Sequence, residues 1–385
     1  MHLAKRTKVI EKTKIEESLR LMEEHPEIIS LGAGEPDFDA PPNVVKAAQK
    51  FLSEGFTHYG PLQGRNELRE AVAKKLKKEN KMDVGPEEVI ITVGSKEAIL
   101  LSMLIALDQG DEVLIPDPGY IAYRPIAQTI DAVPISVKLR EEDEFQFHPE
   151  ILGKLITKKT RAIMINTPSN PTGTVFSKKT LEQIADFVVQ HELMLISDEA
   201  YEKLVYDDSK HISFASLNGM EKYSITLQTF SKSFAMCGFR IGYAVATPEK
   251  IKEMREFKIC TTLAAPTPFQ MAAVEALRGS SSYTEMMRNE YDRRRKMLIA
   301  RLNEIPNIHC TTPKGAFYAF PNIIETGMKS IQFSDFLIEK AKVITIPGTE
   351  FGKFGEGFVR LSFATGYGKI EKALDRIETT LKKLH

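Results

Sequence analysis

Residues 224–240 read SITLQTFSKSFAMCGFR, an apolar run that passes into a loop rich in polar side chains. Ser224–Leu227 is typical of a short strand. The loop after it carries two hydroxyls, an amine and a guanidinium, on Thr229, Ser231, Lys232 and Arg240. Ligands of open α/β sheets bind at the carboxyl ends of strands. The loop therefore suits a phosphate-bearing ligand, although a solvated polar loop would explain it if it stood alone.

The middle of the chain repeats this alternation of apolar strands and amphipathic helices. Helices are expected at Ser95–Leu107, with Ser95 as a plausible cap, and at about Lys178–His191. Further strands are expected at Glu88–Thr92, Glu112–Ile115, Arg161–Ile165 and Leu193–Ser197. Such a βαβ rhythm predicts an α/β fold whose mainly parallel sheet is covered by helices on both faces.

The pattern changes after residue 282. Long helices are expected at about Tyr283–Leu302 and at Lys369–Leu384, with short strands between them at Ala316–Phe320, Val343–Ile346 and Phe358–Phe363. We therefore predict a large domain over residues 46–285 and a smaller α+β domain over residues 286–385. Residues 1–45 hold one helix and the segment LGAGEPDFDAPP. They have no sheet of their own and are expected to pack with the small domain.

Composition excludes several classes of protein. Of the 385 residues, 42% are hydrophobic and 27% charged, which argues against disorder, collagen or a coiled coil for the whole chain. The 52 basic residues balance the 52 acidic ones, whereas a nucleic-acid binder usually has a basic excess. The chain is therefore not expected to bind nucleic acid.

The compartment can also be predicted. The three cysteines lie far apart, so a disulfide framework or a zinc cluster is not expected and a reducing cytoplasm fits best. The first residues, MHLAKRTKVIEKTK, lead into no apolar stretch, so no secretory signal is evident. The longest apolar stretch, Ala98–Leu107, is too short for a membrane helix. We expect a soluble cytoplasmic protein without a membrane partner.

Four other polar features accompany the expected strands. Asp198 follows an apolar strand, where a buried carboxylate needs a partner, unless it is only a helix cap. Residues 166–173, NTPSNPTG, form a rigid turn at another strand end. Gly94-Ser95-Lys96 opens a helix, whose N-terminus either binds an anion or is merely capped. Arg360 lies inside the apolar run FVRLSF, either at a strand edge or buried against an anion.

Together these features resemble the class I pyridoxal-phosphate-dependent aminotransferases of fold type I. The resemblance spans nearly the whole chain. Its motifs are LGAGEPDF (31–38), YGPLQGRNELREA (59–71), the NxPxNPTG turn (166–173), SDEAY (197–201), SKSFAMCGFRIG (231–242), KGAFY (314–318) and VRLSFA (359–364). The resemblance implies a large sheet-containing domain that binds pyridoxal 5′-phosphate, and a smaller α+β domain.

The resemblance also implies roles for individual residues. Lys232 would form the Schiff base with the cofactor and then move a proton as general acid–base. Asp198 would accept the proton of the pyridinium nitrogen, which keeps the ring an electron sink. Asn170 and Tyr201 would hydrogen-bond the phenolic oxygen of the ring, with Asn170 also beside the substrate. Lys232, Asp198 and Tyr201 would thus form the catalytic group.

Other matching positions would hold the cofactor phosphate and the substrate. The phosphate would be bound by Ser95, Thr229, Ser231 and Arg240, and Tyr120 would stack on the ring. Lys96, next to Ser95, is also expected among the cofactor-binding residues. Tyr59 would reach the phosphate of the neighbouring subunit, so a homodimer with shared active sites is expected. Arg360 would clamp the substrate α-carboxylate, with Gly34 close by on the N-terminal segment.

The implied reaction is a ping-pong transfer of an amino group from an L-amino acid to a 2-oxo acid, with 2-oxoglutarate as the expected acceptor. Lys96, which directly follows Ser95 beside the phosphate site, matches a Lys that meets the distal carboxylate of aspartate or glutamate in one prokaryotic branch. Aspartate is therefore the preferred donor. THYGP and EYDRRRK resemble archaeal aromatic aminotransferases, so an aromatic or broad donor range is the alternative.

Three other functions compete with this reading. A fold type I β-lyase could share every cofactor residue. A nicotinamide dehydrogenase would need GxGxxG between the first strand and helix, whereas LGAGE lacks the third glycine and a preceding βαβ unit. A non-catalytic regulator would normally add a DNA-binding domain, for which residues 1–30 leave no room, and Lys232 is intact.

Overall fold

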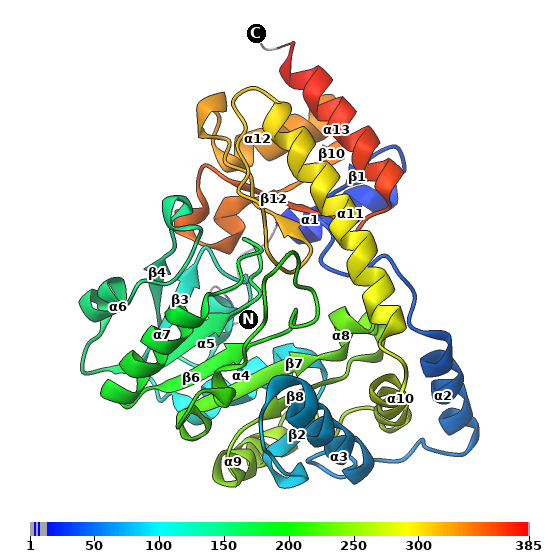
Figure 1. Cartoon of the computed structure of the whole chain (residues 1–385), viewed down its shortest axis with the longest axis vertical. Coiled ribbons are helices and arrows are strands. Elements are labelled where there is room, and N and C mark those ends of the chain that lie inside the picture. Colours follow the sequence, from blue (N-terminus) through cyan, green and yellow to red (C-terminus); the bar gives the residue numbers. More distant parts are fainter. Residues whose placement is uncertain (1–3, 5–6, 8–13, 384–385) are drawn as a thin grey trace.

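The larger of two main layers of strands lies in the lower half of Figure 1. The structure is a computed structural model that describes residues 4, 7 and 14–383, and within these ranges this sheet has seven strands. Their order across the sheet is β2-β8-β7-β6-β5-β3-β4. Their bounds are β2 (Val89–Thr92), β3 (Glu112–Asp117), β4 (Val133–Lys138), β5 (Thr160–Asn166), β6 (Met194–Asp198), β7 (Ser224–Thr229) and β8 (Gly242–Val245).

The predicted mainly parallel α/β sheet is confirmed. Every neighbouring pair is parallel except β8, which runs antiparallel to both β7 and β2. The five strands predicted in this region are present, and the sequence analysis missed β4 and β8. Pro134 in β4 weakens a strand signal, and a proline is tolerated there because β4 lies at the sheet edge.

Helices cover both faces of this sheet, as predicted. Successive residues of a strand point to opposite faces, so Leu195 and Ile196 of β6 belong to different apolar clusters. Leu195 packs with α6 (Pro149–Leu155) and α7 (Lys178–Gln190), and Ile196 with α4 (Gly94–Ala106), α5 (Tyr123–Thr129) and α9 (Pro248–Ile259). A third cluster joins β2 and β8 to α2 (Pro42–Ser53), α3 (Asn66–Lys75) and α10 (Thr267–Arg278).

The C-terminal part of the chain forms a second, smaller α+β unit above the sheet (Figure 1). Within the described residues it contains a three-stranded antiparallel sheet in the order β11-β12-β9. Its elements are α11 (Ser282–Glu304), β9 (Tyr318–Ala319), α12 (Ser330–Phe336), β10 (Val343–Ile344), β11 (Ile346–Pro347), β12 (Val359–Ser362) and α13 (Tyr367–Leu381). Helix α11 runs unbroken across residue 285, from beside α8 (Phe230–Ser233) to the upper unit. No break in the backbone therefore marks a boundary between domains at residue 285, and the predicted boundary stays a prediction.

The N-terminal segment contacts this smaller unit. After α1 (Lys14–Glu24), β1 (Ile29–Ser30) pairs in parallel with β10, and α1 also contacts β11. The segment thus has no sheet of its own but adds one short strand to the C-terminal unit, a strand the sequence analysis did not predict. Residues 1–3, 5–6 and 8–13 of the predicted N-terminal segment lie outside the described residues, as do residues 384–385.

Several predicted boundaries in the C-terminal unit need correction. The strand predicted at residues 316–320 shrinks to β9, because Ala316 has a positive φ of 58° that interrupts an extended backbone. The strand predicted at residues 343–346 is two strands, β10 and β11, in different sheets. The last helix begins at Tyr367, two residues before the predicted start at Lys369.

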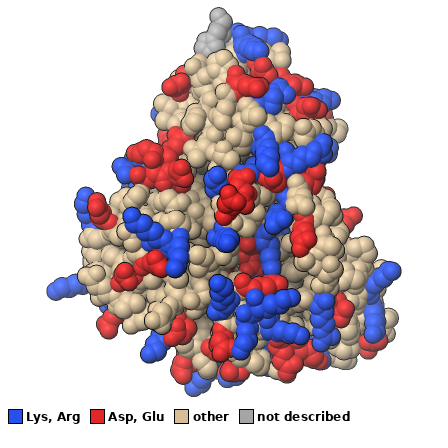
Figure 2. All heavy atoms as spheres, viewed as in Figure 1, with Lys and Arg blue, Asp and Glu red and all other residues tan. Residues whose placement is uncertain are grey.

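Two further observations bear on the composition. Cys237, Cys260 and Cys310 are all free thiols. Figure 2 shows Lys and Arg side chains interspersed with Asp and Glu over the face in view. Among the described helices, none is both long enough and apolar enough to cross a membrane.

Candidate active site

The predicted site residues gather at one edge of the seven-stranded sheet. In the strand register, Asn166 at the end of β5 pairs with Asp198 at the end of β6, and Asp198 pairs with Leu227 of β7. Thr92 at the end of β2 and Thr229 at the end of β7 both pair with Gly242, the first residue of β8. The loops after β2, β5, β6 and β7 therefore leave the sheet side by side.

The loop after β2 enters α4 one residue earlier than predicted. Ser95 is not the helix cap: α4 begins at Gly94, Val93 is the N-cap residue, and no side-chain cap bond is made by it. Instead Oε2 of Glu97 accepts the Val93 N–H at 2.5 Å. The Ser95 hydroxyl is thus not used in capping and can face a ligand.

Two glycines allow this helix start to lie close to its neighbours. Gly94 has a positive φ of 71°, and a Cβ there would lie 2.5 Å from Nη2 of Arg240. A Cβ on Gly242 would lie 2.8 Å from the backbone nitrogen of Ser95. The guanidinium of Arg240 and the backbone of Ser95 therefore converge at the N-terminus of α4, where the first N–H groups have no intrahelical partner.

The loop after β7 adds two hydroxyls to this region. Thr229 caps the short α8: its Oγ1 accepts the Ser231 N–H at 3.1 Å and donates to Ser231 Oγ at 3.0 Å. Arg240 donates through Nη1 to the Cys237 carbonyl at 2.9 Å and is otherwise solvent-exposed. An anion at this point would meet hydroxyls, a guanidinium and a helix N-terminus together.

Asp198 is buried at the end of β6. The Tyr123 hydroxyl donates to its Oδ2 at 2.7 Å, and the Ala200 N–H donates to its Oδ1 at 3.2 Å. The bond from the Ala200 N–H is of the kind that a helix-capping residue makes, so Asp198 also has the contact expected if it were only a cap. Burial raises the pKa of this carboxyl to about 6, and the Tyr123 hydrogen bond opposes that rise. Among the described residues Asp198 forms no ion pair.

Tyr123 is the contact that the sequence analysis missed. It begins α5 and is buried, and its ring packs edge-on against that of Tyr120, with 5.4 Å between the ring centroids. Tyr120, the residue predicted to stack on the cofactor ring, therefore lies beside the tyrosine that bonds Asp198. Burial raises the pKa of Tyr120 to about 12. Tyr120 precedes α5, so the spacing of three residues between the two tyrosines is not a helical pattern, and no local signal in the sequence indicated Tyr123.

Lys232 meets the N-terminal segment. Its Nζ donates to the Gly34 carbonyl at 2.6 Å and lies 5.9 Å from the ring centroid of Phe317. A Cβ on Gly34 would lie 3.7 Å from the Tyr318 hydroxyl. Gly34 is therefore near both the predicted lysine and the C-terminal unit.

Arg360 lies in β12, the central strand of its sheet, and is only 3% exposed. Its Nη1 donates to Asn170 Oδ1 at 3.1 Å and its Nη2 to the Gly32 carbonyl at 2.7 Å, while Nε has no partner among the described residues. The guanidinium lies 4.4 Å from the ring centroid of Tyr318. Burial lowers its pKa. Arg360 was predicted to lie either at a strand edge or buried against an anion, and the prediction of an edge position is wrong.

Asn170 and Tyr201 complete the cluster. The Asn170 N–H donates to Asn166 Oδ1 at 2.8 Å, and Asn166 Nδ2 donates to the Asp198 carbonyl at 2.9 Å. The Tyr201 and Tyr318 hydroxyls are 2.9 Å apart. The turn after β5 is thereby tied to the turn after β6, which fixes Asn170 beside Arg360.

Two predicted residues are not drawn into this cluster within one chain. Tyr59 is 86% exposed, and its backbone neighbour His58 accepts a hydrogen bond from Thr267 at the start of α10. Lys96 is exposed in the first turn of α4 and forms no ion pair with any residue that the structure describes. Both roles stay predictions.

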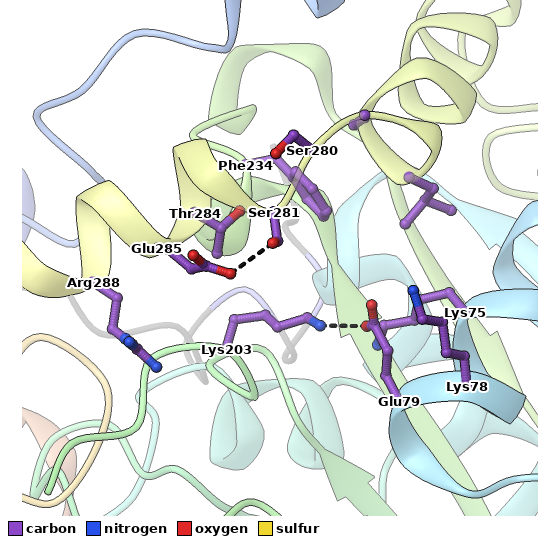
Figure 3. A pocket seen from close by; sticks show the side chains of 13 residues that line it. Lys75, Lys78, Glu79, Lys203, Phe234, Ser280, Ser281, Thr284, Glu285 and Arg288 are labelled. Atoms are coloured by element: carbon purple, nitrogen blue, oxygen red, sulfur yellow. Dashed lines mark hydrogen bonds and ion pairs between the residues drawn. The ribbon is translucent and has the colours of Figure 1, made fainter.

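A separate polar pocket of about 500 Å³ lies between α3, Lys203 and the beginning of α11 (Figure 3). Several of its polar groups have partners within it: Lys203 pairs with Glu79, and the Ser281 hydroxyl donates to Glu285 at 2.6 Å. It contains none of the residues predicted for the site. We assign it no part in the function.

Comparison with known proteins agrees with this geometry. The sequence profile of aminotransferase class I and II matches residues 26–377. The aspartate aminotransferase of Pyrococcus abyssi is 47% identical, over 93% of this chain and 92% of its own. The aromatic-amino-acid aminotransferase 2 of Thermococcus litoralis is 45% identical, over 100% and 99%. The crystal structure of an aromatic aminotransferase from Pyrococcus horikoshii superposes with a TM-score of 0.91 at 46% identity, over 95% and 99%.

These similarities decide between the competing classes of protein. They cover both the sheet and the C-terminal unit, so the match is to a whole enzyme and not to a shared domain. The dehydrogenase and regulator alternatives are excluded, and the predicted aminotransferase activity is confirmed. The chain belongs to the class I and II aminotransferase family.

Proposed function

We propose that the protein uses pyridoxal 5′-phosphate to transfer the amino group of L-aspartate to 2-oxoglutarate, as a cytoplasmic homodimer. The observation that carries the proposal is the convergence of Lys232, Asp198 and Arg360 with the N-terminus of α4 at one sheet edge. An amine, a buried acid, a carboxylate-binding fork and a phosphate-binding helix start are the four groups that this cofactor and an α-amino acid require.

The residues fit the cofactor on independent grounds. Asp198 is buried without a cationic partner among the described residues, which is costly unless a cation such as a protonated ring nitrogen binds beside it. Gly94 and Gly242 leave no room for a Cβ where the phosphate-binding backbone would lie. The Nε of Arg360 is buried with no acceptor, which a bound carboxylate could supply.

Each residue would hold a different part of the cofactor. Lys232 would hold its aldehyde carbon, and Asp198 would hold the proton on its ring nitrogen. Asn170 and Tyr201 would hydrogen-bond its phenolic oxygen, and Tyr120 would cover its ring. The phosphate would be held by Ser95, Thr229, Ser231 and Arg240, together with Tyr59 of the partner subunit. The high exposure of Tyr59 in a single chain supports this last role.

The bound group supplies an electron sink for the electron pair left at the substrate α-carbon. Lys232 would remove the proton from that carbon and deliver it to the cofactor carbon on the other side of the amino nitrogen. Arg360 would bind the α-carboxylate and so orient the C–H bond toward Lys232. Asp198, by keeping its negative charge beside a protonated nitrogen, would maintain the electron demand of the ring.

The choice of aspartate rests on Lys96. It is exposed, has no carboxylate partner among the residues that the structure describes, and lies one residue from Ser95, so its ammonium can meet a distal carboxylate. An aromatic donor is the second candidate, because one of the relatives above is named for aspartate and another for aromatic amino acids at nearly the same identity.

Donor kinetics in variants of Lys96 and Arg360 test the proposal. A charge-assisted hydrogen bond is worth about 1.5–3 kcal/mol, so Lys96→Met should lower kcat/KM for aspartate by roughly 10- to 150-fold and leave phenylalanine nearly unchanged. Arg360→Ala should lower kcat/KM for both donors, because both carry an α-carboxylate. The exposed Lys252 of α9 offers a matched control, and Lys252→Met should change neither. Equal losses for both donors in Lys96→Met would refute the assignment of the side-chain carboxylate to Lys96.

A further inference from the structure

A buried ion pair lies directly behind the proposed phosphate site. Glu97 is in the first turn of α4, two residues after Ser95, and Lys258 is near the end of α9. The Nζ of Lys258 donates to Oε1 and Oε2 of Glu97 at 3.1 and 2.9 Å. Lys258 is 0% exposed, and the Thr262 hydroxyl also donates to Glu97. None of the predicted roles involves this pair.

Glu97 fixes the shape of the helix start. Its Oε2 accepts the N–H of Val93, the residue before Gly94, and so ties the first turn of α4 to the loop from β2. This bond does what the sequence analysis assigned to Ser95. A negative carboxylate is also favourable at a helix N-terminus, because it faces the positive end of the helix dipole.

The same charge is unfavourable for a phosphate. The proposed phosphate site at Ser95 and the Glu97 carboxylate both belong to the first turn of α4, so the two anions would lie roughly 5–8 Å apart at one positive helix end. Two anions at that spacing repel each other, and water that could screen them is excluded on the Glu97 side because the pair is buried. The ammonium of Lys258 cancels the carboxylate charge without removing its hydrogen bond to Val93. Burial lowers the pKa of Lys258, and the neighbouring carboxylate of Glu97 opposes that shift.

Granting the phosphate site proposed above, we infer that Lys258 is a positioning residue for the cofactor: it neutralises Glu97, so that this carboxylate can shape the N-terminus of α4 without repelling the phosphate. A purely structural pair would need no charge here, since a neutral amide could accept the Val93 N–H equally well. Buried ion pairs are in general weak contributors to stability compared with apolar replacements.

The test compares two ligands that differ only in the phosphate. The full-length protein, freed of cofactor, is titrated calorimetrically with pyridoxal 5′-phosphate and with pyridoxal at about pH 8. In Lys258→Met the dissociation constant for the phosphorylated ligand should rise roughly 10- to 100-fold, while that for pyridoxal changes by less than about threefold. In Glu97→Gln combined with Lys258→Met most of the affinity should return, because neither charge remains.

A structural role gives a different result. If Lys258→Met weakens both ligands equally, and the double variant restores nothing, the inference is wrong. Should Lys258→Met fail to fold, Glu97→Gln alone decides. It should bind pyridoxal 5′-phosphate at least as tightly as wild type, because Lys258 then faces the phosphate unneutralised, and a tenfold or greater weakening of both ligands would overturn the inference.

Ser95→Ala separates this inference from the proposed function. Its hydroxyl is assigned directly to the phosphate, so it should weaken only the phosphorylated ligand. If Ser95→Ala is selective and Lys258→Met is not, the inference about Lys258 fails alone. If Ser95→Ala has no selective effect, the proposed phosphate site itself is wrong.

Discussion

Replacing Asp198 by Asn should stabilise the cofactor-free protein while it removes the activity. The exchange keeps the local hydrogen bonds: the Asn oxygen can accept the Ala200 N–H, and its amide can donate to the Tyr123 hydroxyl, which can reverse its role. What changes is the charge. Burial raises the pKa of Asp198 from 3.8 to about 6, so the ionised carboxylate is disfavoured in the folded protein.

The direction in which the stability of the protein changes with pH follows from proton binding by Asp198. The folded protein binds the Asp198 proton more tightly than the unfolded chain does, so this group contributes stability below its unfolded pKa and loses it as the pH rises through its folded pKa. A rise from 3.8 to about 6 corresponds to about 3 kcal/mol, lost between about pH 4 and about pH 7. For a chain of 385 residues this amounts to about 4 °C in Tm.

Differential scanning calorimetry of the cofactor-free protein against pH measures this difference. The Tm of wild type should fall relative to that of Asp198→Asn by about 4 °C from the acidic to the neutral end. The exposed Asp186 on α7 provides a control, and Asp186→Asn should run parallel to wild type. With the cofactor bound the order should reverse, because only the carboxylate can pair with a protonated ring nitrogen. Parallel curves for wild type and Asp198→Asn would show that Asp198 is not desolvated as argued.

Three further outcomes are expected. Lys232→Ala should abolish transamination in a folded protein that still binds the cofactor through its phosphate contacts, and turnover by this variant would remove Lys232 from its role. If Tyr59 completes the partner's site, dilution to the monomer should lower cofactor affinity and turnover together. Sedimentation would follow the dissociation and an activity assay the turnover, and a fully active monomer would contradict this role of Tyr59. Tyr123→Phe removes a hydrogen bond that lowers the pKa of Asp198, so in the cofactor-free protein this pKa should rise above about 6, as read from the pH dependence of Tm.

The sheet could be predicted from the sequence because its strands are apolar runs with polar loops at their carboxyl ends. Strand β6 and Asp198 illustrate this: four apolar or small residues precede a carboxylate that has no place in the interior unless it is used. Strand β8 could not be found in the same way. It is four residues long, begins with Gly242 and is antiparallel, so nothing local distinguishes it from a loop.

The chemistry-bearing residues were predicted more completely than their partners. Arg360 is conspicuous in an apolar strand, but its contacts with Gly32 and Asn170 join residues more than a hundred positions apart. The role of Glu97 in shaping α4 was missed because Ser95 is the better cap by residue type. Its acceptance of the Val93 N–H, and its pairing with Lys258, depend on how α4 packs against α9.

The contacts of Arg360 explain why the site spans three parts of the chain. Its guanidinium has five N–H donors in a fixed plane. One goes to Asn170 in the turn after β5 and one to Gly32 on the N-terminal segment, so both segments orient the plane before any substrate arrives. Three donors remain, including the unpartnered Nε–H, which are enough for a bidentate carboxylate. Because Lys232 in turn donates to Gly34, the same N-terminal segment contacts both the arginine proposed to bind the carboxylate and the lysine proposed to transfer the proton. The backbone of that segment therefore helps to position these two side chains relative to each other.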